Sequence, residues 1–212
     1  MKNFPFFTTE HGAVALVLDQ IPYSGSAYIT ILDSQEPELL LKDVCDFCLA
    51  VGAKAVYASG GADLEKFPLC TSVVLMRCPR ERLADTDAAL FPVQAETLER
   101  FRDIYNTAMR EVPVASCLTG EGGKKLLLAG NGYFVHRGDT LLGIGIAAGE
   151  RIDAVVSVIP GCGGDVLLAL NHALSGTCAE VEVARTNTRA MRLYEKLGFL
   201  PCREVSRWYQ II

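Results

Sequence analysis

Two short segments carry residues whose types and spacing could do chemistry. The first, Gly161-Cys-Gly-Gly-Asp165, separates the apolar run that starts at Val155 from the apolar run Val166–Leu170. A strand, a glycine-rich turn and a helix start can hold a phosphate, because glycines let the backbone approach a ligand and free N–H groups attract anions. Asp165 places a negative charge there and no Lys-Ser/Thr pair follows, so the segment is not a P-loop. A connection that binds nothing has the same pattern, and the turn alone leaves both interpretations open.

The second segment is Cys45-Asp-Phe-Cys48, which has the spacing of a pair of metal ligands. It lies inside a helical pattern, and no second pair of cysteines or histidines completes a set of four ligands. The eight cysteines of the chain are scattered through apolar segments. We therefore expect reduced, buried thiols and no metal site.

Composition limits the class of protein. The 212 residues are 50% hydrophobic, which predicts a globular protein. No apolar run is long enough for a membrane span, and the N-terminus lacks the features of a signal peptide, so we expect a cytoplasmic protein. A net charge of −5 without a basic run argues against nucleic acid and anionic membranes as partners. A small-molecule partner is expected instead.

The hydrophobic pattern predicts an α/β fold with a mixed sheet and two domains, 1–80 and 88–212. Strands are expected at 13–18, 28–32, 55–58, 72–78, 90–93, 133–135, 141–147, 154–159, 180–184 and 203–211. Helices are expected at 37–51, 63–67, 96–111, 165–174 and 188–197, and the segment 112–125 is expected to be a loop. The polar stretch that follows Cys78 marks the boundary between the domains.

The order strand, helix, strand, helix, strand occurs in 28–78 and again in 154–211, which indicates an internal duplication. The first copy enters its helix through "LDSQEPELLL", with three carboxylates and no glycine. Such a turn would repel a phosphate. We interpret the first domain as a smaller βαβ-type domain and a decayed copy, and expect any activity in the second.

The segment "VEVARTNTRAMRLYEKLGF" decides whether the glycine turn is interpreted as a phosphate site or as a connection that binds nothing. It resembles the end of the GNAT-type N-acetyltransferase family, and the resemblance covers about residues 88–212. The residues that match the family signature are Asn187, Ala190, Leu193, Tyr194, Glu195, Lys196, Gly198 and Phe199.

The resemblance implies a GNAT-like domain in which two parallel strands, 154–159 and 180–184, splay apart to admit the pantetheine arm of acetyl-CoA. It implies that backbone groups near Val156, Ser157 and Val158 pair with this arm, and that one N–H polarises the thioester carbonyl. The diphosphate would lie on the amides of Gly161, Cys162, Gly163, Gly164, Asp165 and Val166, with Asn187 also among the donor-binding residues. Tyr194 would give a proton to the departing thiolate, since a phenol with a pKa of about 10 stays protonated at neutral pH. Packing of Tyr194 on the apolar side of its helix is the alternative.

The chain departs from the family pattern at the turn. The family has Gln/Arg-x-x-Gly-x-Gly/Ala, whereas Gly161 stands in the first position and Val166 in the last, so only Gly164 fits. Losing a charged contact costs about 1.5–3 kcal/mol. Arg185, Arg189 or Lys124 is a candidate to supply the missing charge, by sequence proximity alone.

Glu182 is the candidate for the base that deprotonates the amine, with water as the alternative. The predicted function is transfer of an acetyl group from acetyl-CoA to a primary amine of a small molecule or peptide, by direct attack in a ternary complex. The resemblance to the GNAT-type family implies that the segment 111–118 lines the acceptor pocket.

Two other functions stay open at this point. One is a catalytically inactive GNAT-like module that senses a ligand or binds a partner. The other is an NAD-binding oxidoreductase, because Gly161-x-Gly163 follows a strand and acidic residues lie about 20 positions on. This second alternative lacks the third glycine, whose place Val166 takes.

Overall fold

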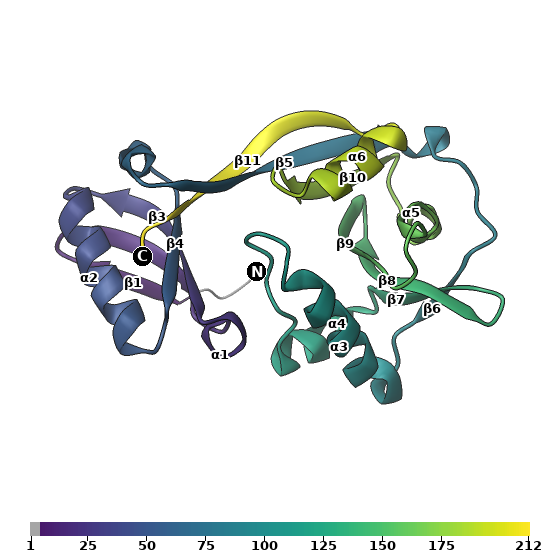
Figure 1. The fold of residues 1–212 in the computed structure, drawn as a ribbon, viewed down its shortest axis with the longest axis horizontal. Helices are drawn as coiled ribbons and strands as arrows, with labels where there is room; N and C mark the ends of the chain where they lie inside the picture. The colour runs from purple at the N-terminus through teal and green to yellow at the C-terminus, as the bar shows by residue number, and fades with distance from the viewer. Residues whose placement is uncertain (1–4) are drawn as a thin grey trace. The chain divides into compact units, whose positions relative to one another are not determined.

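A computed structural model describes residues 5–212, which form two compact units (Figure 1). One unit holds the chain up to Ser72 together with Val205–Ile212, and the other holds Val73–Glu204. These ranges differ from the expected 1–80 and 88–212, because strand β5 (Leu69–Pro79) lies mostly in the second unit and the end of β11 (Leu200–Gln210) in the first. That the two expected ranges act as separate functional domains stays a prediction.

The first unit is a sheet with one long helix on it. Its strands have the order β1-β2-β3-β4, and the end of β11 pairs with β4. Its elements are β1 (Phe6–Thr9), β2 (Gly12–Val17), α1 (Ile21–Ser24), β3 (Ser26–Ser34), α2 (Pro37–Ala50), β4 (Ala55–Ser59) and the 3₁₀ helix η1 (Ala62–Lys66). Pro37 suits the first helical position of α2, because its missing N–H needs no partner there. Helix α2 buries Leu40 and Val44 against Ile29 and Val56 of the strands.

Cys45 and Cys48 lie on the buried side of α2. Burial raises the pKa of each thiol to about 11, so both stay protonated at neutral pH and behave as apolar side chains. All eight cysteines are free thiols, but the expectation that they are buried is wrong for most of them, since only Cys45, Cys48 and Cys78 are buried and Cys202 is exposed. Within residues 5–212, no group of three or more histidine, cysteine or acidic side chains is arranged to hold a metal ion.

The second unit is a mixed sheet with helices on both faces. Its strands have the order β11-β5-β10-β9-β8-β7-β6, in which β9 and β10 are parallel. The elements that follow β5 are η2 (Arg80–Arg82), β6 (Ala89–Pro92), η3 (Ala95–Thr97), α3 (Leu98–Met109), α4 (Gly120–Ala129), β7 (Gly132–Arg137), β8 (Thr140–Ala148), β9 (Arg151–Ser157), α5 (Gly163–Asn171), β10 (Cys178–Ala184), α6 (Thr188–Lys196) and β11. The fold is thus α/β with a mixed sheet, as the sequence predicts.

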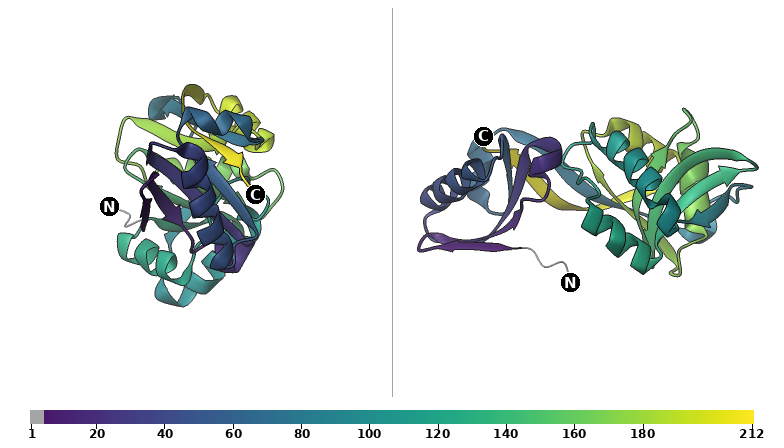
Figure 2. Two further views of the ribbon diagram at one scale, coloured as in Figure 1. Left: turned by 90° about the vertical axis from the view of Figure 1, so that its left-hand side faces the viewer. Right: turned by 90° about the horizontal axis from the view of Figure 1, so that it is seen from below.

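Two apolar cores hold these helices to the sheet of the second unit. Phe101 of α3 and Leu126 of α4 pack on Phe134, Ile144 and Val156, and the two helices lie side by side (Figure 2). On the other face, α5 and α6 pack over β8, β9 and β10. Gly145 allows the close approach of α5, since a Cβ at this position would lie 2.2 Å from Leu170 Cδ1.

Helix α4 lies where the sequence predicts a loop. Its first four residues, "GEGG", have low helix propensity. The side chain of Thr119 accepts a hydrogen bond from the N–H of Gly122, and Gly130 ends the helix in the left-handed conformation. The cap and the burial of Leu126 therefore outweigh the cost of the glycines.

The two units repeat one order of strand pairings. In the first, β1–β2 and β2–β3 are antiparallel, β3–β4 is parallel across α2, and β4–β11 is antiparallel. In the second, β7–β8 and β8–β9 are antiparallel, β9–β10 is parallel across α5, and β10–β5 is antiparallel. This agreement supports the internal duplication inferred from the sequence. Among residues 5–212, no helix combines the length and apolar character needed to cross a bilayer.

Candidate functional site

Strands β9 and β10 pair over only part of their length. Their ladder holds two residue pairs, Glu180 with Arg151 and Val181 with Ile152, whereas β9 continues to Ser157 and β10 to Ala184. The corresponding strands of the first unit, β3 and β4, pair over five residues, from Ser26 with Ala55 to Thr30 with Ser59. Beyond Ile152, the edge of β9 is therefore free of β10.

A β-bulge marks the place where the two strands part. In the ladder between β8 and β9, Ile146 pairs with Ala154 and Ala147 with Ile152, which leaves Asp153 without a partner. An extra residue of this kind bends a strand and increases its twist. The bulge thus gives a physical reason for the end of the β9–β10 ladder directly after Ile152.

The register shows which backbone groups of β9 face the freed edge. The N–H of Val158 donates to the carbonyl oxygen of Leu142 at 2.9 Å, so Val156 also faces β8, two residues earlier. In an antiparallel ladder the alternate residues point the other way, so the backbone groups of Ser157 and Val155 face the edge that β10 leaves. The Ser157 hydroxyl donates to the carbonyl oxygen of Ile159.

The glycine-rich segment is a β-turn followed by the first turn of α5. The Cys162 N–H donates to the Ile159 carbonyl oxygen at 3.2 Å, and Gly161 has a φ of 91°. Proline at the second position and glycine at the third are typical of a type II turn, which explains Pro160-Gly161 without any ligand. Within residues 5–212 we find no acceptor for the N–H groups of Gly163, Gly164 and Asp165, the first three of the helix.

Val166 does not block these N–H groups. Its side chain is fully buried, and a Cβ on Gly143 of β8 would lie 2.7 Å from its Cγ2 atom. The side chain therefore points toward the sheet, and the N–H of Val166 donates to the Cys162 carbonyl oxygen at 3.0 Å within the helix.

Asp165 forms an ion pair with a residue of the β7–β8 hairpin. Arg137 donates from Nη2 to Asp165 Oδ1 at 2.9 Å and from Nε to Asp87 Oδ1 at 2.7 Å. These hydrogen bonds, with Asp87 first, raise the pKa of the Arg137 guanidinium. Arg137 is thus a cation beside the turn that sequence reasoning does not name, and the sequence-based candidates Arg185, Arg189 and Lys124 form no ion pair within the described residues.

Tyr194 lies in the core between α6 and the sheet. It is 8% exposed, and its ring centroid lies 5.8 Å from that of Phe199. Burial raises the pKa of its phenol to about 12. Within residues 5–212 its hydroxyl has no hydrogen-bond partner. Asn187 caps α6, since its side chain accepts a hydrogen bond from the N–H of Ala190 at 3.2 Å.

Carboxylates gather on the side of the sheet that faces away from α5 and α6. Arg151 joins Glu182 and Asp153, with Nη2 at 3.2 Å from Glu182 Oε1 and Nε at 3.3 Å from Asp153 Oδ1. Glu180 pairs with Arg77 of β5. Burial raises the pKa of the Tyr105 phenol in α3, and the nearby Asp153 carboxylate adds to that rise. Arg151 therefore links the carboxylates of Asp153 and Glu182 at the place where β9 and β10 part.

Sequence reasoning names Glu182 but misses Asp153, Tyr105 and Arg137. The first is the extra residue of a bulge, and a bulge has no signature in one sequence. Tyr105 packs against the apolar core under α3, so its residue type and spacing indicate packing and do not reveal its position near Asp153. Arg137 is the last residue of β7, and no local pattern in the sequence points to its contact with Asp165.

Comparison with known proteins identifies the fold. No family model and no curated protein sequence matches the chain. A solved GCN5-related N-acetyltransferase from Anabaena variabilis matches 94% of this chain and 59% of its own, with a TM-score of 0.62 and 12% identity. A tandem GNAT protein from the clavulanic acid biosynthesis pathway matches 94% of this chain and 78% of its own, with a TM-score of 0.55 and 12% identity. The chain has a GNAT-type fold.

A conserved protein of unknown function from Staphylococcus epidermidis has a similar structure, matching 99% of this chain and 94% of its own with a TM-score of 0.62 and 12% identity. The GNAT-type fold confirms the resemblance stated from "VEVARTNTRAMRLYEKLGF". It also removes the basis of the dinucleotide alternative, because that fold requires a mostly parallel sheet, whereas β7–β8, β8–β9 and β10–β5 are antiparallel.

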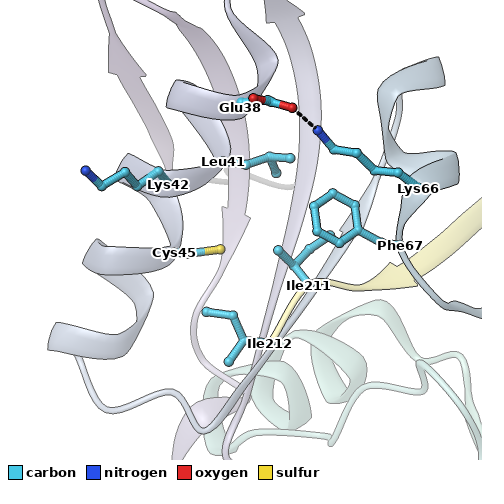
Figure 3. Close-up of a pocket in the computed structure, with 8 residues that line it drawn as sticks. All are labelled: Glu38, Leu41, Lys42, Cys45, Lys66, Phe67, Ile211 and Ile212. Atoms are coloured by element: carbon cyan, nitrogen blue, oxygen red, sulfur yellow. Dashed lines mark hydrogen bonds and ion pairs between the residues drawn. The ribbon is translucent and has the colours of Figure 1, made fainter.

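The first unit of the GNAT-type fold contains a hollow of about 320 Å³ (Figure 3). Its lining is mostly apolar, with Leu41 and Cys45 of α2 opposite Phe67 and Ile211. At one end, Lys66 Nζ and Glu38 Oε1 form an ion pair at 2.5 Å. None of its lining residues belongs to the unit that contains the freed edge of β9.

Proposed function

We propose that the protein is a cytoplasmic acyltransferase that moves an acetyl group from acetyl-CoA to a primary amine of a small molecule or peptide. One observation carries the proposal. The β9–β10 ladder ends after two pairs, on the strand that leads into the N–H groups of α5 that have no acceptor among residues 5–212. An extended chain with amides at one end and phosphates at the other fits this arrangement.

In this proposal the pantetheine arm lies along the freed edge of β9. The backbone groups of Ser157 and Val155 bond to its amides, because they point away from β8. The diphosphate lies on the N–H groups of Gly163, Gly164 and Asp165 at the positive end of the helix. Val156 and Val158 already use their backbone groups toward β8, and Gly161, Cys162 and Val166 shape the turn.

The chemical step forms a carbon–nitrogen bond. The neutral amine attacks the thioester carbonyl carbon, and an N–H of Ser157 or Val155 stabilises the oxyanion. Collapse breaks the carbon–sulfur bond and releases CoA thiolate, while the amide product keeps the acetyl group. Asp153 or Glu182 accepts the proton that the amine loses, and the thiolate gains a proton from Tyr194 or water.

Binding and turnover test the proposal separately. Acetyl-CoA at 100 times its Kd stabilises the protein by about 2.7 kcal/mol, which raises the melting temperature of a protein of this size by roughly 5–10 °C. Turnover is followed by chromatographic detection of free CoA with a panel of primary amines, since the chain's own eight thiols would react with a thiol reagent. No thermal shift at millimolar acetyl-CoA together with no CoA release contradicts the proposal.

One observation favours the second function, an inactive module that binds a ligand. The pKa of Tyr194 is about 12 and its hydroxyl has no partner within residues 5–212, which makes it a weak proton donor. A thermal shift with acetyl-CoA but without CoA release for any amine would support this module over the enzyme.

A further inference from the structure

The first turn of α5 carries two opposite charges that meet. Asp165 stands at the third position of the helix, and its N–H is one of the three that lack an acceptor in the described part of the chain. Its carboxylate turns away from the helix backbone to Arg137, at 2.9 Å. Only the side chain of Asp165 therefore separates the Arg137 guanidinium from the Asp165 N–H.

Arg137 is held from two sides. Asp87 binds its Nε atom at 2.7 Å, so one carboxylate fixes the guanidinium from the loop before β6 and the other from α5. Two carboxylates and one guanidinium give the cluster a net charge of −1. Arg137 can exchange Asp165 for a phosphate oxygen and still be held in place by Asp87, because a guanidinium has five N–H donors.

We propose that Arg137 is the cation that meets the phosphate of the acyl donor, and that Asp165 competes with this phosphate for it. The pair sets the donor specificity of the site, and the proposal rests on the function proposed above. Arg137 stands in for the Gln or Arg that the GNAT turn has at the position of Gly161. Asp165 weakens the binding of every phosphorylated donor and leaves a phosphate-free thioester unaffected.

The expected size follows from Coulomb's law. A unit of like charge about 4 Å from a phosphate charge weakens binding about fivefold in water-like surroundings. Asp165→Asn keeps the shape of the side chain and removes this charge, so the Kd for acetyl-CoA should fall about fivefold. Arg137→Gln removes the attraction, and the Kd should rise about fivefold or more.

Asp87→Asn is the matched control. It removes the same charge from the same guanidinium, but Asp87 lies on another segment, so its loss should leave the Kd unchanged or raise it. Calorimetry with acetyl-CoA and with S-acetylpantetheine, which has no phosphate, is carried out at one salt concentration on all four proteins, and circular dichroism verifies that each is folded.

Tighter acetyl-CoA binding in Asp165→Asn alone, without change for S-acetylpantetheine, supports the proposal. Equal Kd values for the wild type and Asp165→Asn overturn it while leaving the acyltransferase function intact. An equal gain in Asp87→Asn also overturns it, because general charge would then explain the effect. Absence of acetyl-CoA binding in all four proteins overturns both the proposed function and this inference.

Discussion

Replacing Tyr194 with phenylalanine removes one hydroxyl and tests two of its properties. The side chain is 8% exposed, and within residues 5–212 its hydroxyl has no hydrogen-bond partner. The folded protein therefore loses no hydrogen bond in Tyr194→Phe. The buried side-chain atoms without a partner among the described residues are Ser34 Oγ and Asn131 Oδ1, so the Tyr194 hydroxyl is not a fully buried unsatisfied group. We expect the free energy of unfolding at pH 8 to change by less than about 1 kcal/mol.

The substitution should also change the dependence of stability on pH. The phenol pKa is about 12 in the folded protein and about 10 in an unfolded chain. Below pH 10 both states keep the proton, so Tyr194 adds no pH dependence. Between pH 10 and 12 the unfolded state loses the proton first, and stability falls. Two pKa units correspond to about 2.7 kcal/mol, which the wild type loses by pH 12 and Tyr194→Phe keeps.

Urea denaturation followed by circular dichroism at several values between pH 8 and 11.5 measures this difference. Other groups titrate in the same range, but they are shared by both proteins and cancel in the comparison. Identical pH profiles would refute the burial argument. At pH 8, a proton-donor role predicts a fall in kcat of about 10²-fold or more. An unchanged kcat would assign Tyr194 to packing alone.

Three further predictions test the site and its supports. If Asp153 is the base, Asp153→Asn should lower kcat about 10²-fold in steady-state kinetics, with little change in the KM for acetyl-CoA. The matched control Glu182→Gln also loses a contact with Arg151 and should lower kcat less. The reverse order of the two kcat values would assign the base to Glu182. Arg80→Met removes three hydrogen bonds of 2.7–2.8 Å that hold the end of α5 and the loop after it. The free energy of unfolding, measured in urea, should fall by about 3 kcal/mol. A fall of less than about 1 kcal/mol would contradict this prediction. Gly143→Ala places a methyl group 2.1 Å from the Val156 carbonyl oxygen and should lower the free energy of unfolding by about 1–3 kcal/mol. Adding Val166→Ala should not restore the stability measured by thermal unfolding. The Val156 carbonyl oxygen lies closer to the new methyl group than the Val166 side chain does, and this backbone atom remains in the double variant.

Elements with a strong local pattern could be predicted from the sequence. Helix α6 begins at an asparagine cap and ends before Gly198, and its expected range, 188–197, differs from Thr188–Lys196 by one residue. Helix α2, with proline in its first turn and an apolar stripe, is expected at 37–51 and is Pro37–Ala50 in the structure, which is also a difference of one residue. In both cases the residues that fix the ends lie within the element itself.

Features that depend on distant residues could not be predicted. The position of β5 between β10 and β11 is a matter of topology, and its pairing with β10 joins segments about 100 residues apart in the chain. The orientation of Val166 depends on Gly143 of another strand. The partner of Asp165 is Arg137, from a hairpin earlier in the chain. A single sequence does not reveal such pairs.

The comparison between the two units limits where a donor could bind. Both units repeat the same pairings around a parallel crossover, but β3 and β4 keep five pairs where β9 and β10 keep two. In the first unit, therefore, β4 occupies the edge that the pantetheine arm would need. Its crossover helix also begins with Glu36-Pro37-Glu38, in which Pro37 has no N–H and the two carboxylates repel a phosphate. Either difference is enough to prevent a donor from binding to the first unit along a strand edge and at a helix start. We therefore assign the donor to the second unit alone.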